Sequence, residues 1–96
     1  MPMKRKDVMA KALRITTSIN KKSREERSKR PTAVFAEDYN RLRAAALEAF
    51  PSLEQLFPPT VSTFQGGAAS FWSHQSYSEI DSFAEQIYQI LAEQED

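Results

Sequence analysis

The side chains that could carry out covalent or acid–base chemistry lie around the only histidine, His74. Ser70 and Ser73 precede it, and Asp81 follows it. Nucleophilic catalysis needs a nucleophile, a base and an orienting carboxylate that meet in three dimensions. The sequence around His74 has no nucleophile elbow or other motif that would hold such groups together. We therefore expect a loop without enzymatic activity and assign no catalytic residue.

Sites for metals, nucleotides and redox cofactors have no support in the sequence. The chain has one histidine and no cysteine, so the usual zinc ligand sets are missing. The pair Gly66–Gly67 lacks the further glycines and the lysine of a phosphate-binding loop. We expect no cofactor, no metal and no small-molecule substrate.

The strongest signal in the sequence is an uneven distribution of charge. Residues 1–30 contain eleven lysines and arginines against three carboxylates, a net charge of +8. Residues 31–96 contain two arginines against ten carboxylates, a net charge of −8. Such asymmetry indicates a charged partner. We divide the chain accordingly into a basic amphipathic helix and polar arm, 1–30, and an acidic helical body, 31–96.

Hydrophobic periodicity predicts an all-α fold, a small helical bundle. Its three main helices cover about residues 7–22, 33–50 and 77–93, with a short helical turn at 52–57 and a long loop at 58–76. Within that loop, residues 61–64 and 70–72 could pair as a hairpin across the two glycines.

Capping residues support two of these boundaries. Ser76 and Glu79 have the spacing of a capping box at the start of the last helix, and Ser52 and Gln55 have the same spacing at the start of the short turn. Pro51 lacks an amide donor and should end the second helix.

The first helix is amphipathic. Its apolar stripe consists of Val8, Ala12, Ile15 and Ile19, widened by Met9 and Leu13. Residues 20–30 contain no large hydrophobic side chain. This stretch either extends the helix into solvent or forms a mobile linker.

Two sets of residues are candidates for binding a partner. The first is the basic arm, with Lys4, Arg5, Lys11, Arg14, Lys21, Lys22, Arg27 and Arg30. The second is a group of aromatic residues near the glycine pair, with Phe64, Phe71, Trp72 and Tyr77. The aromatic residues could stack on bases or anchor a protein partner. The favoured interpretation is that they fill the gap between the two helices of the acidic body, because large aromatic side chains are usually core.

Two functions fit these features. The first is a non-enzymatic protein–protein interaction module, an adaptor, assembly or regulatory factor whose basic helix contacts an acidic protein surface. A body of residues 31–96 has a small core, so we also expect self-association as a homo-oligomer or a stable complex. The alternative is a small nucleic-acid-binding regulator whose basic arm contacts phosphates.

A membrane is the least favoured partner. The apolar runs are too short to span a bilayer, and the basic helix has no aromatic residue for the membrane interface. The absence of cysteine fits a reducing compartment. We expect a cytoplasmic protein.

Overall fold

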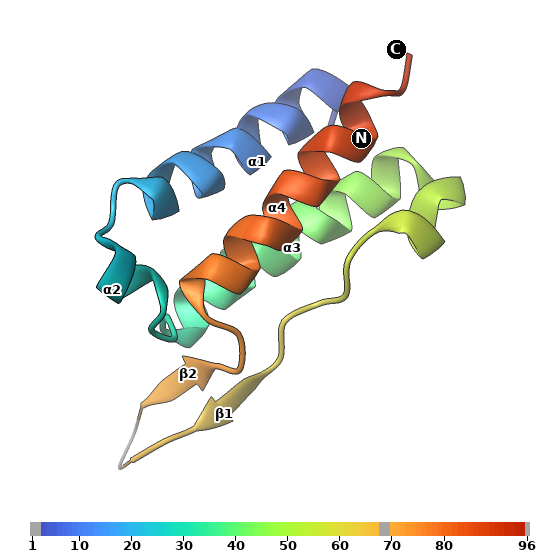
Figure 1. Cartoon of the computed structure of the whole chain (residues 1–96). Coiled ribbons are helices and arrows are strands. Elements are labelled where there is room, and N and C mark those ends of the chain that lie inside the picture. The colour runs from blue at the N-terminus through green and yellow to red at the C-terminus, as the bar shows by residue number, and fades with distance from the viewer. Residues whose placement is uncertain (1–2, 68–69, 96) are drawn as a thin grey trace.

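The computed structural model describes residues 3–67 and 70–95. The elements in chain order are α1 (Arg5–Asn20), α2 (Arg24–Arg27), α3 (Ala33–Ala49), the 3₁₀ helix η1 (Pro51–Leu56), β1 (Thr63–Gln65), β2 (Phe71–Ser73) and α4 (Tyr77–Ala92). The helices α1 and α4 lie side by side, α3 packs against both, and the hairpin projects from one end of the bundle (Figure 1). The predicted helical bundle is confirmed, with a small sheet added to it.

The apolar stripes of the three long helices meet in one core. The buried side chains are Val8, Ala12, Ile15 and Ile19 of α1, Ala36, Tyr39, Leu42 and Ala46 of α3, and Ile80, Ala84, Ile87 and Leu91 of α4. In α1 and α4 these positions follow the spacing i, i+4, i+7, i+11, which places them on one face of a helix. The predicted stripe of α1 is confirmed except for Leu13, which is 52% exposed.

The stretch from residue 20 to residue 31 is neither an extension of α1 nor a free linker. It contains the single-turn helix α2, whose N-cap Ser23 accepts a hydrogen bond from the Glu26 amide at 3.2 Å. Its far end is fixed by backbone bonds from Tyr77 N to Lys29 O at 3.0 Å and from Ser73 N to Pro31 O at 2.9 Å. Pro31 is its one fully buried side chain, so most of this segment is held by hydrogen bonds and other polar contacts rather than by apolar packing.

The connection predicted as a long loop at 58–76 contains a hairpin. β1 and β2 are antiparallel with Phe64 opposite Trp72, and Trp72 also forms a bridge to Thr32 at the start of α3. Gly67 has a φ of +86°, a conformation that glycine adopts without steric cost. The hairpin considered from sequence is therefore present, displaced by one or two residues; residues 68 and 69 lie outside the described residues.

Of the two capping boxes predicted from sequence, the structure contains the one at α4 and lacks the one at η1. At α4, Ser76 Oγ accepts from Glu79 N at 3.2 Å, and the Glu79 carboxylate accepts from Ser76 N at 3.1 Å. The box predicted for Ser52 and Gln55 is wrong. Because Pro51 starts η1 one residue earlier, Ser52 lies inside the turn and no side chain caps it.

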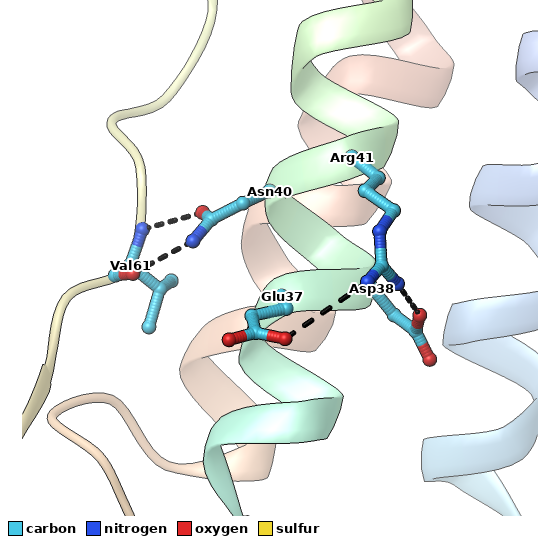
Figure 2. A network of polar contacts seen from close by, with 5 residues as sticks. All are labelled: Glu37, Asp38, Asn40, Arg41 and Val61. Carbon is cyan, nitrogen blue, oxygen red and sulfur yellow. Dashed lines mark hydrogen bonds and ion pairs between the residues drawn. The ribbon is translucent and has the colours of Figure 1, made fainter.

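Side chains of α3 hold the segment that follows η1. Tyr39 Oη donates to Pro59 O at 2.9 Å, and Arg43 Nε donates to Pro58 O at 2.6 Å. Asn40 donates to Val61 O at 2.9 Å and accepts from Val61 N at 2.8 Å (Figure 2). Burial raises the pKa of Tyr39 far above its ordinary value, so its hydroxyl remains a donor at any physiological pH.

The contact between Asn20 of α1 and Asp81 of α4 predicts that the stability of the fold depends on pH. The pKa of Asp81 is raised, mainly by partial burial and to a smaller extent by the negative charge of Glu85 one turn further on. A hydrogen bond from Asn20 and the positive charge of Arg27 lower this pKa, but they offset only part of the increase. When folding raises the pKa of an acid, the ionised form destabilises the folded state. This loss of stability is present at neutral pH and disappears as the pH falls through the raised pKa. We expect Asp81→Asn to melt at a higher temperature than the wild type at pH 7.

The difference in melting temperature between Asp81→Asn and the wild type should vanish near pH 3, where the aspartate and the asparagine side chains are both neutral. Asn20 Nδ2, now 3.4 Å from Asp81 Oδ1, can donate to the amide oxygen in the same way. Melting curves followed by circular dichroism at both pH values test this, with the exposed Glu54→Gln as the control. A wild type that is more stable than Asp81→Asn at pH 7 would contradict the assignment.

Candidate functional site

Four of the eight predicted basic residues have partners within the chain, and Arg5 is the clearest case. Arg5 Nη1 donates to Leu91 O at 3.0 Å and to Met9 Sδ at 3.3 Å. Leu91 lies in the last turn of α4, where the helix dipole is negative and where Glu93 and Glu95 add further negative charge. Arg5 therefore stabilises the end of α4.

Three further cations hold residues 22–30 in place. Lys22 Nζ lies 4.7 Å from the centre of the Tyr77 ring, and Arg27 Nη1 donates to Asn20 Oδ1 at 3.3 Å. Arg30 Nε donates to His74 O at 3.3 Å, and its guanidinium lies 5.6 Å from the Phe64 ring centre. These contacts give Lys22, Arg27 and Arg30 structural roles.

The other four predicted basic residues form a row along one side of α1, which we call the basic row: Lys4, Lys11, Arg14 and Lys21. At 3.6 residues per turn they lie within about 100° of one another and extend over about 25 Å. Within residues 3–67 and 70–95, their side chains make no ion pair and no hydrogen bond. The structure thus brings half of the predicted basic residues together with their charges uncompensated.

A groove between α1 and α3 runs beside the basic row. Its lining includes Lys11, Arg14 and Ile15 from α1 and Phe35 and Asp38 from α3, and its volume is about 310 Å³. The Asp38 carboxylate does not pair with the row, because Arg41 Nη1 holds it at 2.7 Å (Figure 2). Arg41 is also 3.9 Å from Glu37, so one arginine engages both carboxylates on this side of α3.

A second hollow lies on the outer face of α1. It has a volume of about 500 Å³ and is lined by Ala10, Leu13, Arg14, Thr17, Ser18 and Lys21. Leu13 is one of the few large hydrophobic side chains exposed in the described residues. Leu13 was predicted from sequence to lie at the edge of the apolar stripe. On a helical wheel it lies about 130° from the centre of that stripe, an angle that would have separated it from the core.

The four predicted aromatic residues do not form one cluster. Tyr77 packs edge-on against Phe35, with ring centres 5.0 Å apart, between α3 and α4. Phe64, Phe71 and Trp72 lie on the hairpin, where Trp72 Nε1 donates to Gly66 O at 3.2 Å. Only Tyr77 therefore lies between the two helices, as the favoured interpretation expected for all four.

Phe71 contributes to a separate surface. It is 54% exposed and lines a groove of about 660 Å³ with Val34, which is 68% exposed. This groove lies between the hairpin and the first turn of α3, away from the basic row.

The residues around His74 are engaged in local structure. Ser73 is fully buried, and its hydroxyl donates to Gln75 O at 2.7 Å and accepts from Gln75 N at 3.0 Å. The His74 ring packs 4.8 Å from the Phe64 ring. Among the described residues, no three His, Asp or Glu side chains are grouped closely enough to hold a metal ion.

No protein-family model matches the chain, and neither a curated protein nor a solved structure matches it. None of the helices in the described parts of the chain has both the length and the apolar character needed to cross a membrane.

Proposed function

We propose that this chain is a non-enzymatic protein–protein interaction module, of the adaptor, assembly or regulatory kind, whose basic row binds an acidic protein surface. The observation that supports this most directly is the lack of side-chain partners for the row within the described residues. Uncompensated charges on one surface attract a surface of opposite charge and accelerate association. The other four predicted cations, by contrast, have contacts that stabilise the fold.

A protein partner fits this surface better than a nucleic acid. The exposed Leu13 lies beside Arg14 and Lys21 in the same hollow, and an apolar side chain of a protein could cover it. A phosphate backbone offers nothing apolar at this position. A duplex would also carry its charge beyond α1, toward the carboxylates of residues 31–96, which would repel it.

Self-association belongs to the same proposal. Exposed carboxylates in α4 and at its C-terminal cap, such as Glu79, Glu85 and Glu93, could supply the acidic surface in a second copy. Such an oligomer would dissociate as salt is added, because screening weakens contacts between exposed charges. Sedimentation velocity at low and high salt measures this directly.

The test compares two variants with the same change in charge. Arg14→Glu with Lys21→Glu alters the row, and Arg24→Glu with Lys29→Glu alters exposed cations outside it. Binding of a short labelled oligoglutamate peptide and of a labelled DNA duplex of similar length is followed by fluorescence anisotropy. We expect the row variant to bind the peptide about tenfold more weakly or worse, and the control variant to change far less.

Two results would contradict the proposal. Equal losses in the row variant and the control variant would mean that overall charge, not the row, decides binding. Tighter binding of the duplex than of the peptide, with a steep decrease in affinity as salt is added, would favour the nucleic-acid function instead.

A further inference from the structure

We infer that the partner segment is an acidic amphipathic α-helix that lies along the outer face of α1 and covers Leu13. This inference rests on the proposed function and specifies its partner. The surface concerned is the hollow on the outer face of α1, to which Arg14 and Lys21 of the basic row contribute.

The shape of the hollow suits a helix. Ala10 and Thr17 are seven residues apart, so they lie one above the other on the same face, with Leu13 beside them. Small side chains at these positions allow a second helix to approach closely. Leu13, at 52% exposure, would then pack between side chains of that helix.

The charges suit the same arrangement. Arg14 and Lys21 are also seven residues apart and flank the face formed by Ala10, Leu13 and Thr17. In coiled coils, charged residues that flank the apolar seam in this way pair with opposite charges on the facing helix. Carboxylates seven residues apart on a partner helix would meet both cations, about 10 Å from each other along the axis.

An extended peptide is a poorer match for this surface. A strand must satisfy its backbone N–H and C=O groups, usually at the edge of a sheet. The helix α1 uses its own backbone groups internally and offers none to a strand. A helical partner is already satisfied, so only side chains need to match.

The outer face of α4 in a second copy is a poorer match as well. Its exposed positions carry glutamate, glutamine, serine and one alanine, so it offers carboxylates but no large apolar side chain for Leu13. The fitting partner is therefore a helix of another protein that combines acidic and apolar residues. With a single exposed leucine at the centre of the contact, we expect binding that is reversible and sensitive to salt.

The test uses the full chain and two labelled peptides of about 20 residues, long enough to form a helix alone. The first carries glutamates seven residues apart beside a leucine. The second has the same composition with its glutamates spread around the helix. We expect the first peptide to bind at least about fivefold more tightly, and Leu13→Ser to weaken it by about fivefold, as for one lost apolar contact.

Controls separate this inference from the proposed function. Leu56→Ser removes an equally exposed leucine, 60% exposed in η1, and should leave binding unchanged. If both peptides and oligoglutamate bind alike and Leu13→Ser has no effect, the helical partner is wrong while the basic row stands. If none of the three binds, the proposed function fails too. If the chain forms a dimer that the acidic peptide cannot dissociate, a second copy occupies this face, and the inference is overturned.

Discussion

A chain shortened to residues 31–96 should lose its cooperative thermal transition and most of its helical circular-dichroism signal. The truncation removes α1, whose buried Val8, Ile15 and Ile19 pack in the same core as α3 and α4. Burying a side chain of this kind contributes about 1.5–3 kcal/mol, so the three together approach the net stability of a whole small domain. The truncation would also expose apolar side chains of α4, the helix against which α1 packs most extensively.

The control is a chain that lacks only residues 1–3. It keeps α1 and the Arg5 contact to Leu91, and it should melt close to the full-length chain. If residues 31–96 alone melted cooperatively, with helical content in proportion to length, α1 would be a dispensable arm. Such a result would contradict the core described above.

The second large effect is expected for Asn40→Ala, which should lower the free energy of unfolding by about 2 kcal/mol. Asn40 makes two hydrogen bonds to the backbone of Val61, whose side chain is only 3% exposed. The substitution removes both bonds and leaves an amide and a carbonyl in a partly buried position without their partner. Urea denaturation, followed by circular dichroism, measures the change.

Arg41→Ala is the matched control, because it removes contacts of the neighbouring residue on the exposed side of α3 (Figure 2). The Arg41 side chain is 62% exposed, and surface ion pairs of this kind contribute at most about 1 kcal/mol. Equal losses of stability in the two variants would show that Asn40 does not fix the segment after η1.

The helices could be predicted from sequence because their signals are local. The stripe of Val8, Ala12, Ile15 and Ile19 repeats at helical spacing, and Ser76 with Glu79 marks the start of α4 within four residues. The Ser52 box failed because Pro51, one residue earlier, fixed the start of the turn. Local patterns thus compete, and the stronger constraint on the backbone decides.

The candidate site could be predicted only in part, because its members are selected by contacts between distant residues. The sequence identifies eight cations but not which of them have partners. Arg5 meets Leu91, 86 positions away, and Arg30 meets His74, 44 positions away. The bridge from Thr32 to Trp72, which anchors the hairpin, is equally non-local. Only the packed structure shows that four of these eight cations, the basic row, are left for a partner.

The most direct test of the basic row is a titration of the ¹⁵N-labelled full chain with oligoglutamate, followed by amide chemical shifts. We predict that the largest changes fall between Lys11 and Lys21, with Leu13, Arg14 and Ser18 among them, and that added salt reverses them. Largest changes in the hairpin, or an undisturbed spectrum of α1 at saturating peptide, would contradict the assignment of the basic row as the partner-binding site.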